Sequence, residues 1–153
     1  KHLRSVTAQS VLEIAVGDGS RALEVLDLLA KNAASSNEGE PTSIRFVAMD
    51  QFEMGGGSHT LKEFHQLMRN SGVRPQVFPE PIDRGLMRVA HTIGSIDLII
   101  ISSDAGSWQT PETKSLLSRI SHEDSLILFE TENGWNVLAL SDLGAEPVHR
   151  RAA

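Results

Sequence analysis

The chain has 153 residues, the size of a single domain, and 40% of them are apolar, as in ordinary soluble globular proteins. It contains no cysteine, which excludes disulfides, iron–sulfur clusters and thiolate zinc sites, and its formal charge of -6 disfavours a nucleic-acid partner. No apolar run approaches the roughly 20 residues that span a membrane, and no apolar signal region follows the first residues. We therefore expect a cytoplasmic protein that binds neither nucleic acid nor a membrane.

Short apolar runs of strand length alternate along the chain with segments of helical spacing. Several runs are apolar without alternation, which is typical of strands that are covered by helices on both faces. In chain order, the expected strands are 10–16, 44–49, 76–78, 96–101 and 125–129. Between them, apolar residues recur every three or four positions and predict helices around 22–29, 61–68, 86–93 and 116–120.

This alternation predicts an α/β fold, because parallel neighbouring strands need a crossover that a helix supplies. We expect one domain over 1–153, a three-layer α/β/α sandwich with a Rossmann-like, mostly parallel sheet of about five or more strands. The polar segment 32–43 is expected to be a surface connection, and the tail 142–153 is expected to fray. Ligands of such sheets bind beyond the carboxyl ends of the strands, so the segments that follow the strands are examined for a site.

The first of these segments, a glycine turn between a strand and a helix, carries the strongest functional signal. Its sequence GDGSRA at 17–22 fits the pattern G-x-G-x-x-[G/A], in which glycines let the backbone approach a ligand at a helix start. The alternative is a turn that only packs strand against helix, with Asp18 or Ser20 as the helix cap. Glu13, a carboxylate in an apolar strand, needs partners, which could be the turn backbone or a cationic ligand group.

Asp50 ends the second expected strand, where its two oxygens suit the two hydroxyls of a ribose. The alternative is an aspartate that caps a helix or a turn. Nicotinamide enzymes place their ribose-binding acid about 20 residues after the glycine turn, whereas Asp50 lies further on. The glycines at 55–57 predict either a cofactor lid or a flexible connection, and the missing lysine disfavours a Walker loop.

The later strands are followed by further polar residues. After the third strand, Ile82 could pack on a flat base while Asp83 accepts from an exocyclic amine, or Asp83 could cap the next helix. Segment 102–108 offers hydroxyls, a carboxylate and a tryptophan, as expected of a substrate pocket. Asp104 and Glu130 could act as a base or hold a cation, or form a solvated acidic rim. The six histidines lack metal-ligand spacing, and the absence of G-x-S-x-G disfavours a Ser-His-Asp hydrolase.

These residues resemble the class I methyltransferases that use S-adenosylmethionine (SAM), and are nearest the small O-methyltransferases of the catechol type. The first motif of that family, an acid followed by alternate glycines, is matched by EIAVGDG at 13–19, except that Ala15 replaces the first glycine. The resemblance runs from about 11 to 133. It implies that the acid supports the SAM amino group, that the turn packs on the methionine part, that Asp50 binds the ribose and that position 82–83 contacts adenine. The cofactor-binding residues it implies are Glu13, Ala15, Gly17, Asp18, Gly19, Asp50, Gln51, Ile82, Asp83 and Ser102.

The chain departs from this family in four further respects. Ser102 stands where the cation-dependent members have a metal-binding acid, with Asp104 two residues on. Glu130 and Thr131 stand where those members carry an Asp-Asn pair, so no metal is predicted. The chain also ends soon after the fifth strand, so we expect it to lack the antiparallel hairpin that usually completes the sheet. The N-terminal helices that often cover the substrate are expected to be absent as well.

The predicted function is SAM-dependent methyl transfer to an oxygen or nitrogen of a small-molecule acceptor, mainly by positioning, with Asp104 or Glu130 as the base. A nicotinamide-dependent oxidoreductase domain is one alternative, supported by the glycine pattern at 17–22. A degenerate, non-catalytic SAM-type binding module is another, favoured by Ala15, Ser102 and the missing hairpin. Because the covering helices are expected to be absent, the acceptor pocket could be completed by a partner subunit in a homo-oligomer, or the pocket could be missing.

Overall fold

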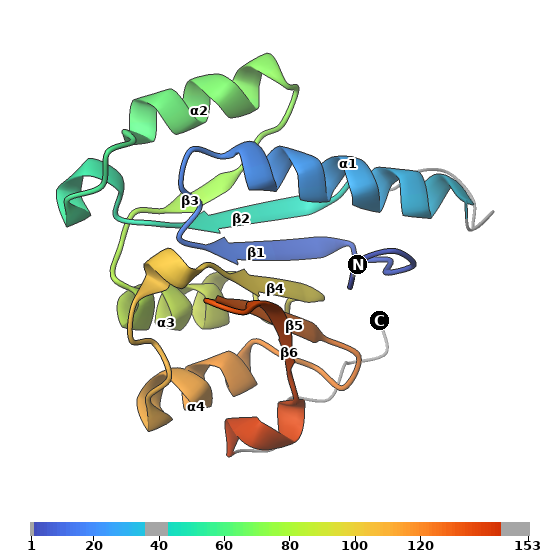
Figure 1. Cartoon of the computed structure of the whole chain (residues 1–153), viewed down its shortest axis with the longest axis vertical. Coiled ribbons are helices and arrows are strands. Elements are labelled where there is room, and N and C mark those ends of the chain that lie inside the picture. The colour runs from blue at the N-terminus through green and yellow to red at the C-terminus, as the bar shows by residue number, and fades with distance from the viewer. Residues whose placement is uncertain (1, 36–42, 145–153) are drawn as a thin grey trace.

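The computed structural model describes residues 2–35 and 43–144, which form a three-layer sandwich with helices on both faces of one sheet (Figure 1). The strands are β1 (Ser10–Ile14), β2 (Arg45–Met49), β3 (Gln76–Phe78), β4 (Leu98–Ile101), β5 (Leu126–Thr131) and β6 (Gly134–Leu138). The helices are α1 (Ser20–Ser35), α2 (Leu61–Asn70), α3 (Ile82–Thr92) and α4 (Pro111–Arg119), with 3₁₀ helices at Phe52–Gly55, Ser103–Ala105 and Leu140–Leu143. The predicted α/β sandwich is confirmed, as are its five expected strands.

The sheet has the order β3-β2-β1-β4-β5-β6, and β1 to β5 run parallel. The carboxyl ends of these five strands therefore meet at one edge of the sheet. At that edge the chain turns back after β5, and β6 pairs antiparallel with it, Thr131 opposite Gly134. The prediction that the chain lacks an antiparallel hairpin is therefore wrong.

Two apolar layers hold the helices against the sheet. Successive residues of a strand point to opposite faces, so Val11 packs toward α1 and α2, while Leu12 packs toward α3 and α4. The four residues of β4 are all buried, which explains why its sequence is apolar without alternation. Among the described residues, no helix is both long enough and apolar enough to cross a membrane.

The connection predicted at 32–43 begins later than expected. Helix α1 continues to Ser35, and the side-chain amide of Asn32 donates to the carbonyl oxygens of Leu3 and Val6, both at 2.8 Å. The Asn32 side chain thus holds the N-terminal segment against α1, whereas the sequence had placed this polar residue in a surface connection. The predicted tail 142–153 also begins later than expected, because Asp142 and the buried Leu143 belong to the 3₁₀ helix Leu140–Leu143. The rest of the connection, 36–42, and the rest of the tail, 145–153, lie outside the described residues.

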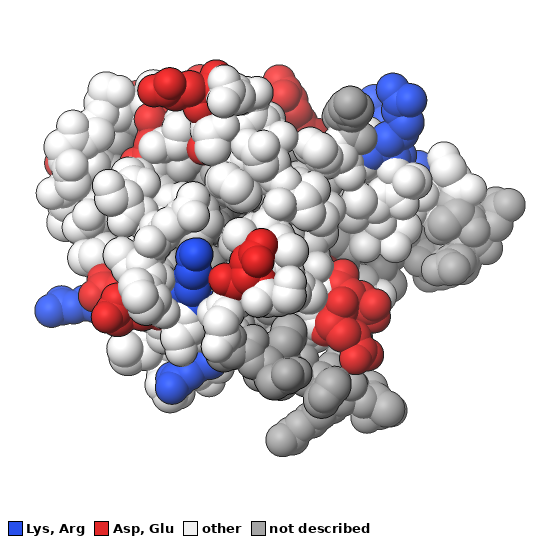
Figure 2. Space-filling view, turned by 60° about the horizontal axis from the view of Figure 1, so that its bottom comes forward, with Lys and Arg blue, Asp and Glu red and all other residues white. Residues whose placement is uncertain are grey.

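Charged side chains of both signs are scattered over the face of the molecule shown in Figure 2. On the face shown in Figure 2, the lysine and arginine side chains lie apart from one another among acidic ones. The described residues therefore present no continuous basic patch on this face, as the negative formal charge suggests.

Candidate functional site

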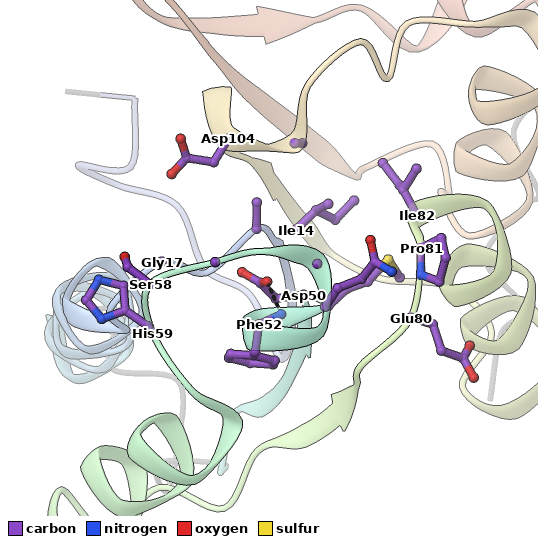
Figure 3. A pocket seen from close by; sticks show the side chains of 16 residues that line it. Ile14, Gly17, Asp50, Phe52, Ser58, His59, Glu80, Pro81, Ile82 and Asp104 are labelled. Carbon is purple, nitrogen blue, oxygen red and sulfur yellow. Dashed lines mark hydrogen bonds between the residues drawn. The ribbon is translucent and has the colours of Figure 1, made fainter.

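A pocket of about 520 Å³ opens at the carboxyl edge of the sheet (Figure 3). Its walls come from the segments that follow β1, β2, β3 and β4, as expected for a parallel sheet. Its volume falls in the range of roughly 300–1,000 Å³ that is usual for small-molecule sites. Six of the predicted site residues line it, namely Ala15, Gly17, Asp50, Gln51, Ile82 and Asp104.

The two glycines of the first turn have different roles. A Cβ added to Gly17 would meet no atom within 4 Å, and Gly17 lines the pocket, so its backbone is open to a ligand. A Cβ added to Gly19 would lie 2.9 Å from Cδ2 of Leu67 in α2. Gly19 therefore allows the turn to pack closely on α2 and does not line the pocket. Of the two roles that the sequence allowed for the turn, approach to a ligand fits Gly17 and close packing against a helix fits Gly19.

Ala15 has a left-handed backbone, with φ of 64°, and its N–H donates to the carbonyl oxygen of Met49 at 2.8 Å. Side chains are disfavoured in this region, by roughly 1–2 kcal/mol per residue, and glycine is not. The replacement of glycine by alanine thus adds backbone strain as well as a methyl group. Ala15 nevertheless lines the pocket as predicted.

Asp50 divides its two oxygens between the fold and the pocket. Oδ1 accepts from the backbone N–H of Phe52 at 2.7 Å, which closes a turn at the end of β2. Oδ2 has no hydrogen-bond partner within the described part of the chain, and Figure 3 shows the carboxylate between Gly17 and Ile82. One oxygen is therefore available to a ligand hydroxyl, although the sequence suggested two.

The segment after β3 forms the opposite end of the pocket with Glu80, Pro81 and Ile82. Asp83 is exposed on the first turn of α3 and does not line the pocket, so the structure does not place it to accept from a base. The Glu80 carboxylate pairs with Arg88. Ile82 is thus the predicted residue that can pack on a flat ring there.

Glu13 is fully buried and does not reach the pocket surface. Its Oε1 accepts from Nη1 of Arg21 at 3.2 Å, and its buried Oε2 has no hydrogen-bond partner. Burial raises the pKa of Glu13 from 4.5 to about 7, against the opposing effect of Arg21, and the nearby carboxylates of Asp50 and Asp18 add to the rise. The predicted partners of Glu13, the turn backbone or a ligand cation, are replaced by an arginine of α1.

Arg21 also joins Glu13 to Glu130, a link that the sequence did not reveal. Its Nη2 lies 3.7 Å from Oε2 of Glu130, and its guanidinium lies over the ring of Trp135, 5.1 Å from the ring centre. Arg21 thereby connects β1, β5 and β6 through one side chain. No local sequence pattern predicts this role of Arg21, because its partners come from distant parts of the chain.

Glu130 is tied to the segment that follows β4. Its Oε2 accepts from the backbone N–H and the hydroxyl of Ser103, both at 3.1 Å, and lies 3.4 Å from the hydroxyl oxygen of Ser102. The hydrogen bond from the Ser103 backbone is the main cause that lowers the pKa of Glu130. Neither Glu130 nor Ser102 lines the pocket, and Ser102 is buried and caps the short helix that contains Asp104.

Asp104 is exposed and lines the pocket on the β4 side. Ser58 and His59, which follow the three glycines, line it on the β2 side and were not predicted as site residues. The glycine segment 55–57 contributes to the wall through Gly55 and Gly57. Among residues 2–35 and 43–144, no three His, Cys, Asp or Glu side chains are grouped so as to hold a metal ion.

No family model matches the sequence, and no curated protein matches it either. The fold is similar to that of a SAM-dependent methyltransferase from Clostridium acetobutylicum, with a TM-score of 0.50 and 17% identity over 78% of this chain and 41% of that one. It is also similar to TehB from Haemophilus influenzae, with a TM-score of 0.54 and 11% identity over 80% of this chain and 35% of that one. A SAM-dependent methyltransferase from Agrobacterium tumefaciens is similar as well, with a TM-score of 0.52 and 13% identity over 84% of this chain and 40% of that one.

The chain shares its fold with SAM-dependent methyltransferases. It spans about two fifths of the length of these solved structures. Identities this low show the fold alone, so the catechol-type subgroup and the roles of the site residues stay predictions.

Proposed function

We propose that the chain binds SAM in the pocket above Gly17 and Asp50, and that it transfers the methyl group to a small-molecule acceptor. The observation that carries this proposal is the free Oδ2 of Asp50, set beside the open backbone of Gly17 in a pocket of about 520 Å³. A carboxylate oxygen accepts from a ribose hydroxyl, and a glycine without a Cβ admits a ligand chain.

The residues present suit the three parts of this cofactor. Asp50 would hold the ribose, Ile82 would pack on the base, and Gly17 would lie under the methionine part. When bound, SAM supplies an electrophilic methyl group on a sulfonium. The protein's contribution is to align an acceptor with that methyl, which needs no covalent help from a side chain.

Asp104 is the better candidate for a base, because its carboxylate lines the pocket and makes no side-chain hydrogen bond within the described residues. Glu130 already accepts two hydrogen bonds from Ser103, and its lowered pKa makes it a weaker proton acceptor. We therefore assign Glu130 to positioning of the segment after β4. The acceptor is proposed to be a small molecule with a nucleophilic oxygen or nitrogen.

A calorimetric titration of the full chain with SAM, S-adenosylhomocysteine and NAD tests the cofactor. The variant D50N keeps an oxygen for the Phe52 N–H but places an amide nitrogen where Oδ2 lay, so it should weaken SAM binding at least about tenfold. D83N is the matched control, because Asp83 is an exposed acid near the same edge that does not line the pocket. Tight NAD binding without SAM binding would contradict the proposal, and so would equal effects of D50N and D83N.

A SAM-binding module without catalysis is the second candidate. It is favoured by one observation, namely that only one of the two predicted catalytic acids lines the pocket. Incubation with SAM and a panel of hydroxyl and amine acceptors separates the two, with formation of S-adenosylhomocysteine as the signal. Turnover that falls in D104N supports methyl transfer with Asp104 as base.

A further inference from the structure

The pocket is lined by few ionisable side chains, and most of them are acids. Within the described residues, the ionisable side chains that line it are three acids, Asp50, Glu80 and Asp104, and one histidine, His59. SAM carries a sulfonium and an ammonium, which acids attract, and one carboxylate, which they repel. The cofactor carboxylate therefore needs a hydrogen-bond donor in the pocket wall, a role that the three acids cannot fill.

Ser58 and His59 occupy the place where this carboxylate would arrive. Figure 3 shows both at the Gly17 end of the pocket, with Asp104 on the other side of Gly17 and Ile82 at the far end. A base that packs on Ile82 and a ribose at Asp50 leave the amino-acid part of the ligand at Gly17. It would then lie between Asp104 and the Ser58–His59 pair.

The side chain of His59 is available for this role. Nearby Asp18 already accepts from the N–H and hydroxyl of Ser20, at 2.9 and 2.7 Å, and Glu63 accepts from the N–H of Thr60 at 3.1 Å. The hydrogen bonds from Ser20 are the main causes that lower the pKa of Asp18, and His59 adds a smaller electrostatic effect. His59 itself makes no hydrogen bond within the part of the chain that the structure describes, so a ring N–H can turn toward the pocket.

We infer that Ser58 and His59 bind the carboxylate of the cofactor's amino-acid part, which rests on the proposed SAM site. The imidazole N–H and the serine hydroxyl donate to the two carboxylate oxygens, and both come from one short segment after the glycines at 55–57. This segment, rather than the helix start of α1, then selects ligands that keep their carboxylate. At the start of α1, Asp18 is the group that accepts from the Ser20 N–H.

The test compares two ligands that differ only in this group, SAM and decarboxylated SAM, each titrated calorimetrically into the full chain. The variant H59A should weaken SAM binding about tenfold or more, as expected for loss of a hydrogen bond to a charged group, and leave decarboxylated SAM nearly unchanged. S58A should have the same pattern of effects as H59A, with weaker SAM binding and nearly unchanged binding of decarboxylated SAM. H91A is the matched control, because His91 is an exposed histidine of α3 that does not line the pocket.

The outcomes separate this inference from the proposed function. If the unmodified chain binds neither ligand, the SAM site itself is refuted, and the inference with it. If the chain binds both ligands equally well, or if H59A weakens both by the same factor, the SAM site stands and the carboxylate role of His59 is refuted. A loss that is specific to SAM in H59A, and absent in H91A, supports the inference.

Discussion

The buried carboxylate of Glu13 should make the stability of this protein fall as the pH rises from about 5 to 8. Burial raises the pKa of Glu13 from its ordinary 4.5 to about 7, so in this window the folded chain binds a proton that the unfolded chain has lost. Stability is then highest at the acidic end and declines until Glu13 is ionised in both states. At 1.36 kcal/mol per pKa unit, the decline amounts to roughly 3 kcal/mol.

The substitution E13Q isolates this effect, because glutamine resembles the protonated acid and still offers an oxygen to Arg21. Urea unfolding of both proteins at pH 5 and pH 8 gives the difference in free energy of unfolding. We expect the two proteins to be similar at pH 5 and E13Q to be the more stable at pH 8, by up to roughly 3 kcal/mol. The other titrating groups are shared by both proteins and cancel in the difference.

E24Q is the matched control, since Glu24 is an exposed acid of α1 one turn from Arg21. The difference in free energy of unfolding between E24Q and the unmodified protein should stay constant with pH. If the difference for E13Q also stays constant from pH 5 to 8, Glu13 does not change its protonation there. The reasoning from burial would then be refuted, and Arg21 would be sufficient to keep the carboxylate ionised.

Three further predictions concern the first turn. A15G should raise the free energy of unfolding, measured in urea, by up to about 1 kcal/mol. The reason is that the strain energy of alanine at positive φ is larger than the entropy that glycine adds to the unfolded chain. A loss of stability in A15G would show that the methyl group of Ala15 packs favourably. G19A should lower the free energy of unfolding by at least about 1 kcal/mol, because its Cβ would lie 2.9 Å from Leu67. G17A should lose SAM affinity by a larger factor than G19A, which thermal melts with and without SAM would measure. Equal losses of affinity in the two variants would contradict the separation of their roles.

The parts of the fold that the sequence predicted are those that local pattern decides. Strand β1, its glycine turn and the start of α1 follow one another in the chain, and each has its own signal. Strand β6 was missed because Gly134 and Asn136 interrupt its apolar residues, and Val137 is 51% exposed. An edge strand with one open face lacks the apolar run that marked the other five.

The candidate site was predicted where a residue follows directly from the end of a strand. Asp50 and Asp104 come within three residues of β2 and β4, so the rule for parallel sheets placed them correctly at the pocket. The partners of Glu13 and Glu130 were not predicted, because both carboxylates pair with Arg21, which approaches from α1. Their partners are set by tertiary packing, which spacing along the chain does not encode.

The network around Arg21 changes how the acidic residues near the sheet edge are to be understood. Glu13 and Glu130 share one guanidinium, and Glu130 also holds the backbone of Ser103. Two of the acids that the sequence offered as site residues, one for the cofactor and one for catalysis, thus fix the relative positions of β1, β5 and the segment after β4. Asp50 and Asp104 remain free to meet a ligand, and these are the two that the pocket exposes.

Backbone strain points to the same pocket. Among the described residues, the non-glycine residues with positive φ are Ala15, at 64°, and Phe52, at 53°, and both line the pocket. Such conformations cost of order 1–3 kcal/mol each and persist where surrounding contacts hold them. Here the Met49 carbonyl holds Ala15 and the Asp50 carboxylate holds Phe52. These two hydrogen bonds therefore fix the backbone next to Asp50, as expected if its Oδ2 must meet a ligand in a defined position.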